Sequence, residues 1–306
     1  MESTKPRVLV LGSTGLTGNA IAAELDDASD RVEVVRVSRD PHAVERWRAE
    51  GRSAVRLDLD DARTFAGALN GIDRLFVMTG YTVAMTHQTK TITDAAAEAG
   101  VGHIVHLGIF GNGRTTDPHF AWHEMVERYI EGSGVAWSHI HPHFFMDNLL
   151  TSVPIVNGRF YWFMGDKRVG WIAGDDLAAV SAQVLAEGPQ KHASKQYWLS
   201  TEVMNGVEAA AEIAEGLGQP VESVVLTPDD LVAQITSGAM RLPSYVEATY
   251  GASILELVRQ TYDGRLDFGA TTTTTVEDLT ARKPLTLREW VVRYRDSVLA
   301  VGAQAA

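Results

Sequence analysis

The stretch Val8-Leu-Val-Leu-Gly-Ser-Thr-Gly-Leu-Thr-Gly18 decides the fold of this 306-residue chain. Its four apolar residues are typical of a buried parallel strand, and the glycines at 12, 15 and 18 follow at once. Glycines so placed allow a tight turn, a close approach of the backbone to pyrophosphate, and close packing of helix on strand. Because a helical pattern follows, the loop predicts a nucleotide-binding site; the alternative is a tight packing turn. The predicted binding residues are Gly12, Ser13, Thr14, Gly15, Leu16, Thr17 and Gly18.

Beyond this loop, short β-branched runs alternate with amphipathic helical stretches as far as residue 140, which is typical of βα units around a parallel sheet. We expect strands at 7–11, 32–37, 54–58, 74–77, 103–107 and 136–140. We expect helices at 16–25, 43–50, 62–69, 85–99 and 121–131. Right-handed crossovers between such strands give an α/β fold with a doubly wound parallel sheet.

The regular alternation stops after residue 150, and shorter elements predict a smaller C-terminal α/β lobe. Helices are expected at 205–217, 228–237 and 287–299, and a strand at 221–226. We therefore predict a nucleotide-binding domain at 1–150 and a smaller substrate-binding lobe at 151–306, of which 157–200 partly returns to the first domain. The threonine run at 271–275 is expected to be an exposed connector.

Composition and charge exclude several classes of protein. The formal net charge of −12 repels nucleic-acid backbones and anionic lipid surfaces. The absence of cysteine excludes disulfides, thiolate nucleophiles and Cys-type zinc sites, and agrees with a reducing compartment. No apolar stretch reaches the ~18 residues of a membrane span, and the first residues lack a signal-peptide pattern. The sequence predicts a soluble, cytoplasmic protein with neither a nucleic-acid nor a membrane partner.

The ends of the second and third predicted strands indicate which nucleotide is bound. An acid at the end of the second strand binds the ribose of NAD, whereas here the run Arg36-Val-Ser-Arg39 ends in a cation suited to the 2′-phosphate of NADP(H). Asp58 can accept a hydrogen bond from the adenine amino group, and Leu59 can cover its ring. The alternatives are that Arg39 is a solvated surface residue and that Asp58 caps the helix beginning at Ala62.

Five segments, at 12–18, 38–41, 134–148, 170–178 and 279–286, resemble the NmrA-like family of atypical short-chain dehydrogenase/reductases over essentially the whole chain. The resemblance implies a Rossmann fold and an NADP(H) cofactor. It further implies that the loops after the fourth, fifth and sixth strands line the nicotinamide site. The residues concerned are Thr79, Gly80, Leu107, Gly108, Pro142 and Phe144. The family includes quinone- and enone-type reductases alongside NADP(H)-binding redox sensors that catalyse nothing.

The usual catalytic pair of these enzymes, a Tyr followed four residues later by a Lys, is absent from all eight tyrosines. In the isoflavone-reductase branch of the superfamily a Lys before the sixth strand carries the proton, and the resemblance puts His123 in that place. Because the ordinary pKa of histidine is near 6.5, His123 can exchange a proton at neutral pH, and Glu127 one turn later can orient it. The alternative is that His123 only hydrogen-bonds substrate or backbone.

Eight of the ten histidines fall between His87 and His143. His139, His141 and His143 alternate as on one strand face, a pattern found in metal sites. Pro142 is expected to break that strand, and no carboxylate with matching spacing joins the set. No metal site is therefore predicted.

Two further groups complete the predicted site. Phe144 and Phe145 are expected to face the nicotinamide, and the run at 160–164 is expected to form part of a flat apolar substrate wall. Asp175 and Asp176 are expected to cap the helix that follows them.

These features predict an NADPH-dependent reductase that passes a hydride to an electron-poor small molecule of the quinone, enone, imine or azo type. His123, Phe144 and Phe145 are expected to hold this acceptor. Reduction of such acceptors yields a stabilised anion that water can protonate, which tolerates the missing Tyr–Lys pair. The alternative is a non-catalytic NADP(H)-binding redox sensor that acts through a protein partner. The sequence leaves a homodimer open.

Overall fold

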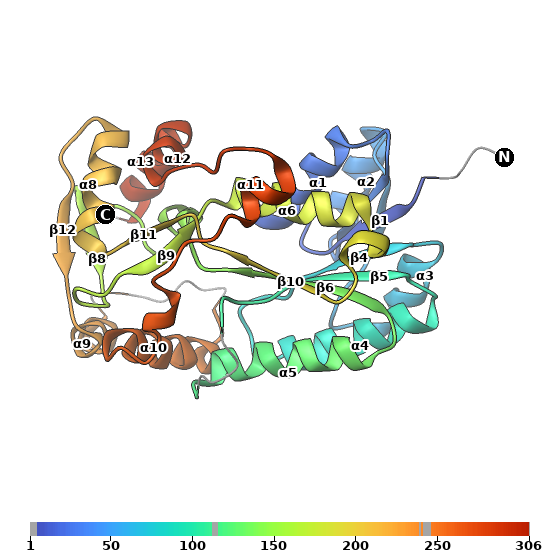
Figure 1. Ribbon diagram of the computed structural model, residues 1–306, viewed down its shortest axis with the longest axis horizontal. Coiled ribbons are helices and arrows are strands. Elements are labelled where there is room, and N and C mark those ends of the chain that lie inside the picture. Colours follow the sequence, from blue (N-terminus) through green and yellow to red (C-terminus); the bar gives the residue numbers. More distant parts are fainter. Residues whose placement is uncertain (1–4, 112–115, 239, 241–245, 306) are drawn as a thin grey trace.

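The centre of the molecule is a seven-stranded parallel sheet with the order β10-β6-β5-β4-β1-β2-β3 (Figure 1). The computed structural model describes residues 5–111, 116–238, 240 and 246–305. The strands are β1 (Arg7–Val10), β2 (Glu33–Ser38), β3 (Ala54–Arg56), β4 (Arg74–Val77), β5 (His103–Leu107), β6 (Ala136–Pro142) and β10 (Lys195–Leu199). β1 pairs with β2 on one side and with β4 on the other, so successive strands are added first on one side of β1 and then on the other. The carboxyl end of β1 is therefore the switch point of the sheet. Ligands of open α/β sheets bind at this switch point.

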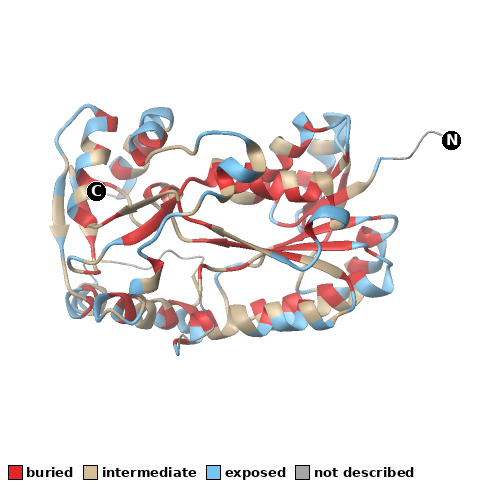
Figure 2. Cartoon of the chain, in the orientation of Figure 1, coloured by how far each residue is buried: buried red, intermediate tan, exposed pale blue. Residues whose placement is uncertain are grey.

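Helices cover both faces of this sheet. One face carries α1 (Leu16–Asp27), α2 (Pro41–Ala49) and α6 (Gly174–Glu187), and the other carries α3 (Phe65–Leu69), α4 (Met85–Glu98) and α5 (Pro118–Gly132). Side chains of successive strand residues alternate between the two cores, as a pleated strand requires: Leu9 and Leu75 face α3, α4 and α5, whereas Val10 and Phe76 face α1 and α6. Figure 2 shows this burial along the central strands. No described helix combines the length and apolarity needed to cross a membrane.

The C-terminal lobe adds two small sheets and its own core. β8 (Arg159–Trp162) pairs in parallel with β12 (Glu222–Val225), and β9 (Val169–Ile172) lies between β7 (Phe144–Phe145) and β11 (Glu202–Met204). Its helices are α8 (Gly206–Leu217), α9 (Pro228–Ser237), α10 (Ala248–Tyr262), α12 (Leu287–Arg293) and α13 (Arg295–Ala305). The buried indoles of Trp162, Trp171 and Trp290 dominate this core. Two elements from the C-terminal half of the chain join the main sheet and its helices: α6 packs on α1, and β10 pairs with β6 at the edge of the sheet.

The predicted doubly wound parallel sheet is confirmed, with shifted ends at several elements. The helix predicted at 62–69 divides into a short 3-10 turn (Ala62–Thr64) and α3, and the one predicted at 287–299 divides at Tyr294. The prediction that the strand is interrupted at Pro142 is confirmed, since Pro142 is the last residue of β6 and His143 lies outside the strand. The Pro142 carbonyl oxygen accepts a hydrogen bond from the Phe110 N–H, at 3.0 Å.

Asp175 and Asp176 do not cap α6, contrary to the prediction. The N-cap residue is Ala173, and both aspartates lie in the first helical turn. Asp175 accepts a hydrogen bond from the Tyr294 hydroxyl, at 2.9 Å, and Asp176 accepts one from the Leu285 N–H, at 2.9 Å. Both carboxylates therefore tie the C-terminal segment to α6.

The threonine run is mostly exposed, as predicted, with Thr273 and Thr275 partly buried. The Thr273 hydroxyl donates to the Trp198 carbonyl oxygen, at 2.8 Å, and the Thr271 carbonyl oxygen accepts from the Ser200 hydroxyl, at 2.6 Å. The segment thus lies along the end of β10 before α11 (Thr275–Thr280) begins.

Candidate functional site

The glycine loop leaves β1 at the switch point of the sheet. Gly12 has a φ of +72°, a conformation that favours glycine. A Cβ at Gly18 would collide with the Gly12 carbonyl oxygen, so only glycine lets α1 begin this close to the loop. α1 has neither a side-chain cap at Gly15 nor an acid in its first turn. Its first N–H groups are thus open to an anion, which agrees with a pyrophosphate site.

The side chains of the loop do not all face outward. Ser13 is buried, and its hydroxyl donates to the Val10 carbonyl oxygen at 2.6 Å and accepts from the Val37 N–H at 3.2 Å. It therefore joins the loop to β2, and only its backbone can contribute to cofactor binding. Thr14 and Leu16 are exposed, and Thr17 is partly buried.

The residues predicted for the adenosine half lie beside this loop. Arg39 is exposed directly beyond β2, and within the described chain its guanidinium has no acidic partner. Asp58 is partly buried, and its carboxylate accepts a hydrogen bond from the Asp60 N–H at 3.1 Å. The capping alternative for Asp58 is wrong, because Asp61 caps the turn at Ala62–Thr64. Leu59 packs against the core under α3 and α4.

The residues predicted for the nicotinamide half follow β4, β5 and β6. Gly80 is exposed and Thr79 is partly buried, whereas Gly108 is buried beneath α5. A Cβ at Gly108 would lie 2.5 Å from Glu127 Oε1, so this glycine is needed for packing. Leu107 packs on the α6 side, and Pro142 is buried. The strand order thus places three groups along one carboxyl edge: the residues predicted for the adenosine half, the glycine loop, and the residues predicted for the nicotinamide half.

The two phenylalanines after β6 point to different neighbours. Phe144 lies edge-on to Trp171, with ring centroids 4.7 Å apart, and to Trp162, at 5.7 Å, in the C-terminal core. Phe145 packs against the core on the α6 side of the main sheet. Phe160 and Trp162 are also fully buried, so this part of the run at 160–164 is core and not the predicted substrate wall.

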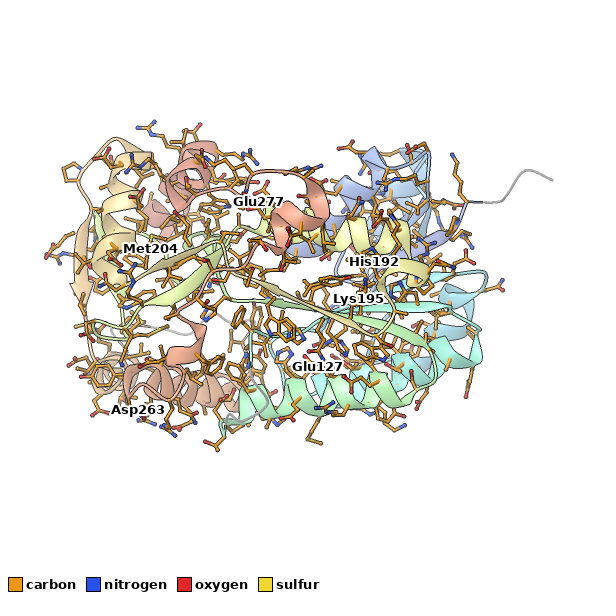
Figure 3. All side chains as sticks on the ribbon, viewed as in Figure 1. Glu127, His192, Lys195, Met204, Asp263 and Glu277 are labelled. Atoms are coloured by element: carbon orange, nitrogen blue, oxygen red, sulfur yellow. The ribbon has the colours of Figure 1, made fainter. Side chains whose placement is uncertain are left out.

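His123 lies on α5 among other imidazoles. Its ring centroid is 5.1 Å from that of His119 and 6.3 Å from that of His106. Burial, with the nearby His119 and His141, lowers the pKa of His123 well below its ordinary value, so the ring is neutral at pH 7. The predicted orientation by Glu127 is wrong. The Glu127 carboxylate, labelled between α5 and the sheet in Figure 3, lies 3.2 Å from His141 Nε2 instead.

Five histidines of β5, β6 and α5 form one cluster, in which His123 is partly buried and the others are buried, namely His106, His119, His139 and His141. Burial lowers the pKa of His119 to about 4 and that of His139 to about 3. His143 stands apart, with its ring 5.0 Å from that of Phe110. Among the described residues, no three His, Asp or Glu side chains are placed to hold a metal ion.

An aromatic wall beside the Gly80 loop was missed by sequence reasoning. Tyr250, on α10, meets Tyr81 edge-on at 5.7 Å and His119 at 5.1 Å, and stacks on Trp122 at 5.9 Å between centroids. The Glu247 carboxylate holds α10 here by accepting from the Thr82 hydroxyl and the Val83 N–H, both at 2.8 Å. Tyr81 directly follows a predicted site residue, but nothing in the sequence links it to residue 250.

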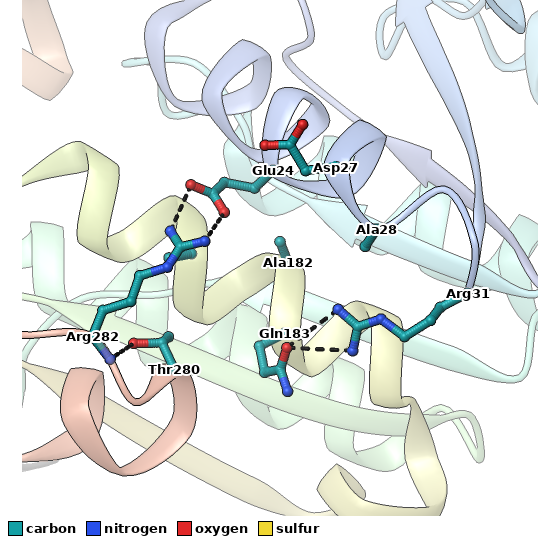
Figure 4. Close-up of a pocket in the computed structure, with 9 residues that line it drawn as sticks. Glu24, Asp27, Ala28, Arg31, Ala182, Gln183, Thr280 and Arg282 are labelled. Carbon is teal, nitrogen blue, oxygen red and sulfur yellow. Dashed lines mark hydrogen bonds and ion pairs between the residues drawn. The ribbon is translucent and has the colours of Figure 1, made fainter.

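Two concavities of the described surface lie away from this edge. One, of about 160 Å³, separates the C-terminal half of α1 from α6, where Arg282 pairs with Glu24 and Arg31 with Gln183 (Figure 4). The other, of about 640 Å³, lies at the amino ends of β1 and β2. Its buried Arg36 is already paired with Asp26. Neither is lined by a residue predicted to bind the cofactor.

A parallel sheet with an uncapped glycine loop at its switch point defines a dinucleotide-binding α/β protein. The NmrA-like family matches residues 4–291, and the chain belongs to that family. It is 29% identical to an NAD(P)H azoreductase of Xenophilus azovorans, over 76% of this chain and 82% of that protein. It is 24% identical to quinone oxidoreductase 2 of Escherichia coli, over 75% of this chain and 81% of that protein.

Solved structures show the same fold. An NADPH-dependent quinone oxidoreductase from Escherichia coli, complexed with NADPH, superposes with a TM-score of 0.79 at 21% identity, covering 94% of this chain and 99% of that one. NmrA, a negative transcriptional regulator solved in complex with NAD, superposes with a TM-score of 0.76 at 16% identity, covering 99% of both chains. The dinucleotides in these complexes agree with the cofactor class predicted from the glycine loop.

Proposed function

We propose that this protein is an NADPH-dependent reductase that transfers hydride to an electron-poor small molecule of the quinone, enone, imine or azo type. The observation that carries the proposal is the uncapped glycine loop at the switch point, with Arg39 directly after the neighbouring strand β2 and without an acidic partner among the described residues. When bound, NADPH supplies the hydride from its nicotinamide ring. The azoreductase and the quinone oxidoreductase among the relatives support this class of acceptor.

Each part of the carboxyl edge has a role in binding. The N–H groups of the glycine loop and of the first turn of α1 hold the pyrophosphate, and Arg39 holds the 2′-phosphate. Asp58 accepts from the adenine amino group, while Leu59 covers the adenine ring. The backbone at Thr79, Gly80, Leu107 and Pro142 lines the nicotinamide half, and Gly108 lets α5 pack closely behind it.

The acceptor lies against His123, whose neutral imidazole donates a hydrogen bond to the acceptor oxygen or nitrogen that gains charge. A neutral ring is a weak acid, so this role requires a product whose anion is already stabilised. Quinones and azo compounds meet that requirement, and solvent completes the protonation. Phe145 and the partly exposed edge of Phe144 contribute the apolar contacts. In this proposal residues 1–150 bind the cofactor, and residues 151–306 form the substrate-binding lobe.

The second candidate function is an NADP(H)-binding redox sensor with a protein partner. Two observations favour it: His123 is neutral at pH 7 and so offers no imidazolium, and the fold is shared with a transcriptional regulator. A sensor needs the same cofactor residues but no acceptor site.

Acceptor-dependent loss of the reduced-nicotinamide absorbance, measured with NADPH and a panel of quinones, enones and azo dyes, tests the reductase directly. Consumption above the protein-free rate with at least one class is expected. NADPH binding without consumption across the panel would favour the sensor.

Replacement Arg39→Ala tests the cofactor assignment. It is expected to weaken NADPH binding by about 1.5–3 kcal/mol, the worth of a charge-assisted contact to phosphate. NADH, which has no 2′-phosphate, serves as the control and should bind nearly unchanged. Titration calorimetry measures both affinities, and equal losses for the two would show that Arg39 does not contact the 2′-phosphate.

A further inference from the structure

A second guanidinium lies next to Arg39. Arg56 is the last residue of β3, which pairs in parallel with β2 so that Arg56 is the register partner of Ser38. Its side chain is exposed, and its Nε donates a hydrogen bond to the Arg39 carbonyl oxygen, at 3.3 Å. The strand pairing therefore brings two arginines, 17 positions apart in the chain, to the same point of the carboxyl edge.

The two arginines differ from the other cations around them. Arg63 is held by Asp61 through two contacts of 2.7 and 3.0 Å, and Arg52 lies 3.5 Å from Glu50. Asp61 is also the acid whose pKa Arg56 helps to lower, but its oxygens are taken by Arg63. Within the described chain, neither Arg39 nor Arg56 has an ion pair with a carboxylate.

Two like charges at adjacent positions of neighbouring strands repel each other. The chain has a formal net charge of −12, so acidic side chains outnumber the basic ones that they could pair with. The adjacent Asp40 caps α2 by accepting the His42 N–H, at 2.9 Å, and within the described chain it forms no ion pair with either arginine. A dianionic phosphate between the two guanidinium groups would remove the repulsion and use their donors.

We infer that Arg56 is a second 2′-phosphate ligand, which forms with Arg39 a two-arginine clamp that selects NADP(H) against NAD(H). The inference rests on the proposed function for the presence of a dinucleotide at this edge. Nε of Arg56 fixes the Arg39 backbone, and its remaining N–H groups bind the phosphate. Arg56 thus contacts the ligand and also positions its neighbour.

The test uses adenosine 2′,5′-bisphosphate and adenosine 5′-monophosphate, which differ only in the 2′-phosphate, with calorimetry on the full chain. Arg56→Gln is expected to weaken bisphosphate binding by about tenfold and to leave monophosphate binding unchanged. Arg63→Gln removes the same charge from a nearby exposed arginine that is already paired, and it should change neither affinity. Because Arg56 is exposed, circular dichroism should show the variant folded.

A second comparison separates contact from positioning. If Arg56 contacts the phosphate, Arg56→Gln in an Arg39→Ala background weakens bisphosphate binding further. If it acts only through Arg39, the double variant matches Arg39→Ala, and the clamp is overturned. Equal losses for both ligands, or an effect no larger than that of Arg63→Gln, also overturn it.

The outcomes for the clamp and for the reductase are distinguishable. Wild-type protein that binds both nucleotides equally but reduces acceptors with NADH would overturn the clamp and leave the reductase in place. Selective loss of bisphosphate binding in Arg56→Gln, with no acceptor reduced by the wild type, would support the clamp and contradict the reductase.

Discussion

Gly18 is the residue on which the geometry of the cofactor site depends most directly. A Cβ there would collide with the Gly12 carbonyl oxygen and lie 2.7 Å from the Leu11 carbonyl oxygen, and neither backbone group can move without shifting β1. We expect Gly18→Ala to destabilise the fold by about 1–3 kcal/mol, as overpacking does, and to weaken NADPH binding.

The matched control for this prediction is Gly67→Ala, on α3, where an added Cβ meets nothing within 4 Å. It should keep full NADPH affinity and at least wild-type stability, since alanine favours helix. Denaturant unfolding and a cofactor titration measure both properties. A Gly18→Ala variant as stable and as tightly binding as Gly67→Ala would contradict the close packing.

His123 allows a prediction about pH. Burial, with His119 and His141 nearby, lowers its pKa well below 6.5, so the ring stays neutral from pH 6 to 8. We expect His123→Phe to lower acceptor turnover while leaving NADPH affinity unchanged. In the wild type, the titration of His123 should cause no step in the rate near pH 6.5. The exposed His42 supplies the control, His42→Phe. A wild-type step near pH 6.5 that only His123→Phe removes would contradict the neutral ring.

The individual residues show what local sequence can predict. The glycine positions could be predicted because the backbone geometry of a single turn determines them. The pairing of Glu127 with His123 was wrong because helical spacing places both on one face but does not show that β6 brings His141 closer. Arg56 was missed because its neighbour Arg39 is reached only through the register of β2 and β3.

Among the elements, α10 has a testable attachment to the candidate site. The Glu247 carboxylate accepts from the Val83 N–H and the Thr82 hydroxyl, which lowers its pKa below the ordinary value of 4.5. The ionised carboxylate therefore contributes its full stabilisation of the folded state above pH 4.5. That contribution is lost as the pH falls through the lowered pKa and the carboxylate is protonated. We therefore expect α10 to loosen below pH 4.5.

Hydrogen exchange of the amides at 248–262 measures this attachment. Glu247→Ala should speed their exchange at pH 7 and remove the additional increase seen in the wild type at acid pH. Glu277→Ala, at an exposed acid on α11, should have no such effect. Unchanged exchange in Glu247→Ala would show that Tyr250 and its aromatic contacts hold α10 alone.

Prediction from sequence succeeded for elements that carry their own periodicity. β4 and β5 have the predicted bounds, and the α/β alternation gave the sheet. β10 and α10 were missed because their places depend on distant partners: β10 pairs with β6, and α10 docks on the loop after β4. No local pattern encodes either contact.

For the whole molecule, the buried histidines determine how stability depends on pH. Burial lowers the pKa of His103, His119 and His143 to about 4 and that of His139 to about 3, and lowers the pKa of His106 and His123 well below the ordinary value. The unfolded chain takes up protons at these sites from pH 6.5 downward, whereas the folded chain does not. The free energy of unfolding should therefore fall from pH 6.5 to about 4, by about 1.4 kcal/mol per pH unit for each proton.

Four carboxyls oppose this trend, because burial raises the pKa of Asp117 and Glu202 as well as that of Asp147 and Asp176. Burial raises the pKa of Asp147 and Asp176 to about 6, so their protonation favours the folded state as pH falls from 6 to 4. The six imidazoles outnumber them. Denaturant unfolding between pH 4 and 7 should show a shallower pH slope in His119→Phe than in the wild type, and an unchanged slope in the exposed variant His42→Gln. An identical slope in all three would contradict the neutral cluster.

The central claim, hydride transfer from NADPH at this carboxyl edge, is tested most directly by NADPH deuterated on one face of the nicotinamide C4. The protein is incubated with each labelled form and an acceptor that it consumes, and the mass of the NADP⁺ formed is measured. A folded site holds the ring in one orientation, so the account predicts that one form loses its deuterium completely while the other retains it. Failure of every acceptor to generate NADP⁺, or mixed loss of label from both forms, would contradict it.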